Sequence, residues 1–266
     1  MRRKEEDIVT KLKGNMTYSR TYRYLAQNKW RVLLVILVAA LPFSLFTFFC
    51  YPQLTTFITN LTKYILQGSY APGELITSHS NLVDWVGEIT YLGVPGRYPT
   101  LLFNWLNLLF TLIALLVLTA FVKVRPWSIF ATVMLFVHLF SSLFFVFVPW
   151  LFPYIASEYS SLYLKQQMLM LFFTPFILGS SIAILPCNIF LVFVAVLGCY
   201  VYFFVFCVVR YVIFLYILSK VSILYMASLF FTFGPFIDFL YIVAIYSLVV
   251  NKVSGGLNRE KAVWKW

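Results

Sequence analysis

Long uncharged runs of apolar residues recur along the chain and predict membrane-spanning helices. A helix needs about 20 predominantly apolar residues to cross the hydrocarbon core of a bilayer, which is about 30 Å thick. Runs without Asp, Glu, Lys or Arg cover residues 32–62, 98–122, 126–157 and 166–209. The last run is too long for one span, and Pro186-Cys187-Asn188 interrupts it near its middle. Because this tripeptide favours a turn, the run predicts a hairpin of two helices.

One further apolar stretch, residues 221–250, is interrupted by Gly234-Pro235 and Asp238 but suits a single span. The expected fold is therefore an all-α, polytopic integral membrane helix bundle with about six transmembrane helices. The predicted spans cover residues 32–52, 100–122, 127–152, 166–185, 189–209 and 222–250. A re-entrant piece at 211–219, or a seventh helix, is the open alternative.

Basic residues gather at the two ends of the chain. With the N-terminus inside, six spans leave 15 of the 20 Lys and Arg residues on the inner side. This asymmetry predicts that both termini are cytoplasmic. Residues 1–31 are then a basic amphipathic N-terminal segment lying on the membrane surface, or alternatively a solvated tail. Residues 252–266 are a basic cytoplasmic tail.

The composition excludes ordinary soluble proteins. Hydrophobic residues make up 62% of the 266 positions and charged residues 11%, whereas soluble domains carry about 25% charged residues. The net charge of +11 follows the predicted topology, and no nucleic-acid-binding motif accompanies it. We therefore expect a multi-pass protein whose partner is the lipid bilayer and not nucleic acid. The composition does not identify which membrane.

The predicted outer loop, residues 53–99, is the longest polar segment between spans. Apolar residues recur at helical spacing between Leu82 and Leu92, and this periodicity predicts a short amphipathic helix. His79, Asp84 and Glu88 would face water or a ligand. The helix would either lie on the outer surface and cover the bundle or fold back as a lid.

Three ionisable residues in or beside the predicted spans are candidates for a ligand or ion path, because charge is costly in a bilayer. His138 and Asp238 lie near mid-depth, so a contact between them is allowed and could relay protons or bind a cation. Alternatively, His138 is a hydrogen-bonded core residue and Asp238 caps the helix that restarts after Pro235. Arg210 either reaches the outer interface from the end of its span or is buried against Asp238; we favour the interface.

Catalytic motifs are scarce in this sequence. It contains no HExxH, GxSxG or P-loop motif and only two histidines. The four cysteines lack CxxC spacing, so we expect no disulfide framework, metal site or cofactor. The alternative to a non-catalytic role is an intramembrane cysteine enzyme, transpeptidase- or protease-like, with Cys187 as nucleophile, His138 as base and Arg210 as electrostatic stabiliser.

We expect a non-catalytic integral membrane subunit of a transporter or of another multi-subunit membrane complex. The six predicted spans, the basic termini and the aromatic content of 20% favour broad surfaces that contact lipid and other membrane subunits. A transport role driven by ATP would require a separate ATPase subunit, because the chain has no P-loop. The polar site at His138 and Asp238 would serve the cargo or a coupled ion.

Overall fold

A computed structural model describes residues 24–25, 29–83, 86–121, 126–185, 187–257 and 264–265. Most of the predicted N-terminal surface segment, together with Asp84, Pro186 and much of the basic tail, lies outside these ranges. Within them, six helices are long and apolar enough to cross a membrane. They cover Val32–Ser69, Leu101–Ala120, Trp127–Phe147, Ala156–Ala183, Ile189–Val221 and Ile223–Val253. The expectation of a multi-pass helix bundle is therefore supported in helix number and type.

Several of these helices extend well beyond the predicted spans. The first consists of α2 (Lys29–Val35) and α3 (Leu41–Leu66), joined by a π-helical turn. The fourth is α6 (Ala156–Ala183), and the fifth is α7 (Ile189–Tyr216) with a terminal π-helical turn. Residues 211–219 therefore continue α7 and form no re-entrant piece. Single charged residues do not end these helices, because such residues can find partners in the bundle or lie beyond the hydrocarbon.

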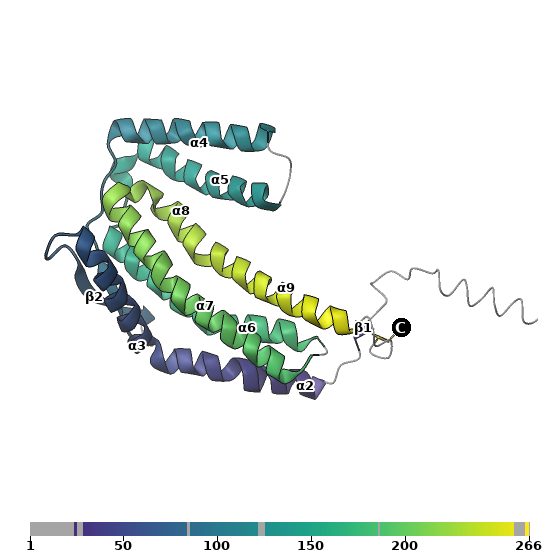
Figure 1. Ribbon diagram of the computed structural model, residues 1–266. Coiled ribbons are helices and arrows are strands. Elements are labelled where there is room, and N and C mark those ends of the chain that lie inside the picture. Colours follow the sequence, from purple (N-terminus) through teal and green to yellow (C-terminus); the bar gives the residue numbers. More distant parts are fainter. Residues whose placement is uncertain are drawn as a thin grey trace, which may run out of the picture.

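The remaining spans differ in how continuous they are. Helices α4 (Leu101–Phe121) and α5 (Pro126–Phe147) form an uninterrupted pair, in contrast to the sixth span. That span consists of α8 (Met226–Phe231), a distorted π-helical turn and α9 (Ile237–Leu257). Figure 1 shows that the α4–α5 pair lies beside α8, whereas α9 continues past it along α6 and α7.

The prediction of an amphipathic helix in the outer loop is wrong. This segment forms an antiparallel hairpin of β2 (Ile76–Val83) and β3 (Val86–Gly93), in which Asn81 is opposite Glu88. Its β-branched residues and glycines favour extended structure over helix. Gly87 also allows a close approach to α3, because a Cβ atom there would lie 2.6 Å from the Tyr51 hydroxyl. His79 and Glu88 are exposed on the hairpin.

The core lies around α6 and α7. Half of the most apolar part of α6 is buried, against 17% for α4 and for α5. The Tyr163 ring of α6 stacks on the Phe214 ring of α7, with centroids 4.6 Å apart. On the other side of α6, the Ser44 hydroxyl of α3 donates to the Phe172 carbonyl at 2.8 Å. The interior is therefore both aromatic and hydrogen-bonded.

Two short described segments, one from each terminal region, lie together at one end of the bundle (Figure 1). Strand β1 (Tyr24–Leu25) pairs antiparallel with β4 (Trp264–Lys265). The start of α2 and the end of α9 lie near this pair (Figure 1). This arrangement is compatible with termini on one side of a membrane. Which side that is stays a prediction from the charges.

Candidate functional site

A buried ion pair connects α7 and α9. Arg210 of α7 donates from Nη1 to Asp238 Oδ1 of α9 at 2.6 Å, the only salt bridge between described residues. Arg210 is 3% exposed and Asp238 is fully buried. Of our two interpretations of Arg210, the favoured contact with the outer interface is therefore wrong, and burial against Asp238 is correct. A charge pair removed from water in this way requires further hydrogen bonds.

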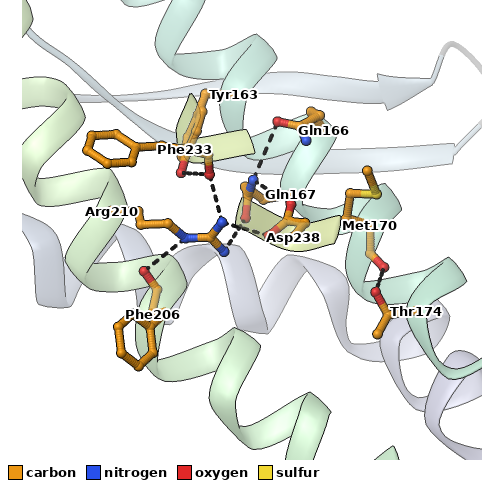
Figure 2. A network of polar contacts seen from close by, with 9 residues as sticks. All are labelled: Tyr163, Gln166, Gln167, Met170, Thr174, Phe206, Arg210, Phe233 and Asp238. Atoms are coloured by element: carbon orange, nitrogen blue, oxygen red, sulfur yellow. Dashed lines mark hydrogen bonds and ion pairs between the residues drawn. The ribbon is translucent and has the colours of Figure 1, made fainter. Parts of the chain in front are cut away.

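Gln167 of α6 supplies these hydrogen bonds (Figure 2). Its Nε2 donates to Asp238 Oδ2 at 3.3 Å, and its Oε1 accepts from Arg210 Nη2 at 3.0 Å. Three side chains from three helices thus form one closed hydrogen-bonded ring. Arg210 Nε also donates to the Phe206 carbonyl one turn earlier in α7, at 3.3 Å. The guanidinium is largely occupied by protein acceptors, so the ring acts as a connection between helices.

The sixth span is broken beside this ring. Gly234 has φ −94° and ψ −115°, which is not helical, and Pro235 has no N–H to donate. Just before the break, the Phe233 carbonyl accepts from Tyr163 Oη at 3.1 Å and from Arg210 Nη1 at 2.7 Å. Side chains from α6 and α7 therefore satisfy a backbone group at the break, as a broken membrane helix requires.

Arg210 connects the two halves of the broken helix through one nitrogen atom. Its Nη1 donates to the Phe233 carbonyl on one side of the break and to the Asp238 carboxylate on the other. Asp238 is also in the first turn of α9, where a negative charge favours the helix N-terminus. Asp238 therefore pairs with Arg210 from the first turn of the helix that restarts after Pro235, and whether it also caps that helix stays a prediction.

Gln166 packs tightly against the break. A Cβ atom on Gly234 would lie 2.9 Å from the Gln166 Cδ atom, so the absence of a side chain permits this contact. Gln166 Oε1 accepts from Gln167 Nε2 at 3.4 Å. Among the described residues, the buried Nε2 of Gln166 has no hydrogen-bond partner. The glutamine pair thus joins the ring to the backbone of the break.

His138 lies in a second polar cluster and does not contact Asp238. Its Nδ1 is 3.2 Å from Ser228 Oγ of α8, and its Nε2 is within 3.3 Å of the Asn107 side chain of α4. The imidazole also stacks on the Tyr225 ring, with centroids 5.0 Å apart. His138 is therefore a partly buried, hydrogen-bonded residue between the α4–α5 pair and α8.

The residues of the cysteine-enzyme hypothesis are not brought together. Cys187 precedes α7 by two residues, whereas Arg210 lies 21 residues into that helix. A rise of about 1.5 Å per residue separates them by roughly 30 Å. The Cys187 thiol is 3.9 Å from the Ile182 carbonyl, and His138 has the partners described above. The structure therefore provides no reacting triad from these three residues.

The described residues contain no group of three His, Cys, Asp or Glu side chains placed to hold a metal ion. No protein family, curated protein or solved structure matches this chain. Sequence reasoning identified Arg210 and Asp238 but missed Gln167 and the Phe233 carbonyl. The signal for Gln167 was its place, with Gln166, at the edge of an apolar run.

Proposed function

We propose that this chain is a non-catalytic integral membrane subunit of a transporter or of another multi-subunit membrane complex. The observation that carries the proposal is the position of α4 and α5. Each buries only 17% of its most apolar part within the chain. Helix α4 packs on α5, and α5 packs on α8. Large side chains such as Phe110, which is 72% exposed, then form a broad apolar surface on α4. A partner helix packing there would bury this surface.

The polar interior supports a structural rather than a catalytic role. The donors of Arg210 bond to one carboxylate, one amide and two backbone carbonyls. Such a ring fixes helices α6, α7 and α9 at the break and leaves α8 to carry the α4–α5 pair.

The topology forms part of this proposal. With both termini in the cytoplasm, the hairpin β2–β3 lies on the opposite side of the membrane. The basic residues at the chain ends then follow the positive-inside rule. A His79→Cys variant in which the four native cysteines are replaced carries one reactive thiol, in β2. A membrane-impermeant thiol reagent should label it on intact cells if the hairpin lies on the outer side, and no labelling would contradict this topology.

Native purification tests the subunit proposal. The full chain is extracted from its own membrane into nanodiscs without detergent, and co-purifying polypeptides are identified by mass spectrometry. We expect a stoichiometric second polypeptide, such as a membrane subunit or a separate ATPase. A second sample in which Phe110 and Leu106 of α4 are replaced by Asn should lose this partner. The matched control replaces Phe49 and Phe46, which are exposed on α3, by Asn and should retain the partner. A chain that purifies alone and monodisperse contradicts the proposal.

A further inference from the structure

Two basic residues lie together where two apolar helices end. Arg97 precedes α4 by four residues, and Lys220 is the penultimate residue of the span Ile189–Val221. Helix ends of this kind lie at the level of the lipid headgroups, where basic and aromatic side chains collect. Tyr98, which is 64% exposed, follows Arg97. The position alone therefore places two cations near headgroup phosphates.

The backbone of Arg97 is held rigidly between two helix ends. Its N–H donates to the Leu218 carbonyl at 3.1 Å, and its carbonyl accepts from the Ile223 N–H at 2.9 Å. Gly96 allows this close packing, because a Cβ atom there would lie 2.9 Å from Ile223 Cγ2. The loop before α4 is thereby fixed against the junction between α7 and α8.

The Arg97 side chain is held by one hydrogen bond, and most of its N–H donors have no acceptor among the described residues. Its Nη1 donates to the Lys220 carbonyl at 2.7 Å, and the residue is exposed. A guanidinium carries five N–H donors. Among the described residues, the Lys220 carbonyl is the one acceptor that the Arg97 guanidinium contacts. The remaining donors keep the planar fork that suits phosphate oxygens.

Lys220 is held by an aromatic ring rather than by an acid. Its Nζ lies over the Tyr70 ring, 4.2 Å from the centroid, and the Tyr70 hydroxyl hydrogen-bonds to Ser219. Among the described residues, no carboxylate lies within 4.0 Å of Arg97 or Lys220. The acid nearest in sequence to Tyr70, Glu74, accepts the Ala71 N–H at 3.1 Å. Both cations are therefore positioned without a neutralising partner.

We propose that Arg97 and Lys220 bind the phosphate group of a phospholipid headgroup. The guanidinium would donate two hydrogen bonds to phosphate oxygens, and the ammonium would add a second positive charge. A lipid is favoured over free phosphate because both residues lie at the ends of apolar helices. The bound lipid would cover the junction between α7 and α8, where the loop before α4 is fixed. This site does not depend on the chain being part of a complex.

Lipid titration of the purified full chain tests the site. Native mass spectrometry follows binding of phosphatidylglycerol and of diacylglycerol with the same acyl chains but no phosphate. We expect phosphatidylglycerol to bind and diacylglycerol to bind more weakly by about tenfold or more. This difference in affinity corresponds to the loss of about one charge-assisted hydrogen bond. Arg97→Gln and Lys220→Gln should each weaken phosphatidylglycerol binding about tenfold. Arg97→Lys should be intermediate because it keeps the charge and loses the fork.

Matched controls separate this site from general charge attraction. Lys252→Gln removes an exposed positive charge at the opposite end of the bundle and should leave lipid binding unchanged. Thermal unfolding without lipid checks that each variant is folded. If inorganic phosphate protects the chain in an Arg97-dependent way and phosphatidylglycerol does not bind, the same site takes free phosphate, and the lipid assignment is overturned. Equal phosphatidylglycerol binding by the wild type and the folded Arg97→Gln/Lys220→Gln variant overturns the site itself.

Discussion

The Arg210–Asp238 pair provides the sharpest prediction on stability. Removing one partner of a buried ion pair typically costs about 3–5 kcal/mol, because the other charge is left uncompensated. Asp238→Asn keeps the side-chain shape and leaves Arg210 three neutral acceptors, namely Gln167 Oε1 and the carbonyls of Phe206 and Phe233. We therefore expect Asp238→Asn to fall at the lower end of that range, near 3 kcal/mol.

Arg210→Met should be the more costly change. It leaves the Asp238 carboxylate with Gln167 as its remaining side-chain donor and removes a donor from the Phe233 carbonyl at the break. The expected loss lies at the upper end of the range, about 5 kcal/mol. The double variant Arg210→Met/Asp238→Asn removes both charges, so it should cost about 1–3 kcal/mol less than the sum of the single changes.

Equilibrium unfolding in bicelles measures these free energies in a double-mutant cycle. Lys252→Met serves as a control, because it removes an exposed charge at the end of α9 and should change the free energy of unfolding by less than about 0.5 kcal/mol. The reasoning is refuted if both single variants resemble this control and their effects simply add. A coupling near zero would mean that the two charges do not stabilise each other in the folded chain.

Three further substitutions test individual contacts. Gly234→Ala should lower the melting temperature, because its Cβ would meet the Gln166 side chain, and Gln166→Ala in the same chain should restore most of the loss; no rescue would contradict this contact. Gly87→Ala should make the hairpin more sensitive to protease, because its Cβ would meet the Tyr51 hydroxyl, and Tyr51→Phe should reverse the effect. His138→Phe should speed amide hydrogen exchange in α5, because the ring can still stack but loses its hydrogen bonds to α4 and α8; unchanged exchange would show that these bonds do not hold the pair.

The helices could be predicted because their signal is local. Six apolar segments follow from composition and length, and the proline break between α6 and α7 separates two of them correctly. The ends of the helices could not be read in the same way. Lys63 and Lys165 mark the edges of the uncharged runs, yet α3 and α6 continue through them. A helix ends where its backbone hydrogen bonds end, and one charge does not decide that.

The hairpin shows where periodicity misleads. Residues 82–92 match a helical spacing of apolar residues, but the pairing with residues 76–83 supplies cross-strand hydrogen bonds that a local pattern does not reveal. Gly87 and Gly93 argued against a helix in this segment, since each glycine destabilises a helix by about 1 kcal/mol relative to alanine. Gly87 also permits the close approach of the Tyr51 hydroxyl to the hairpin.

The candidate site was predictable in its charges and not in its pairing. Asp238 and Arg210 stood out because ionisable residues are rare in apolar spans. Choosing His138 or Arg210 as the partner of Asp238 required the relative positions of α5, α7 and α9. The length of α7 decided the outcome, because a helix ending at residue 209 would have left Arg210 at an interface. Backbone partners such as the Phe233 carbonyl carry no side-chain signal at all.

The role of the chain as a subunit can be tested directly by crosslinking. A photo-reactive amino acid replaces Phe110 on α4 or, as a control, Phe49 on α3, which is 69% exposed. Native membranes are irradiated, and the adducts are identified by mass spectrometry. We predict that position 110 crosslinks to a second polypeptide, whereas position 49 crosslinks to lipid. If position 110 yields lipid adducts alone in membranes that contain all cellular partners, the proposed subunit interface on α4 is contradicted.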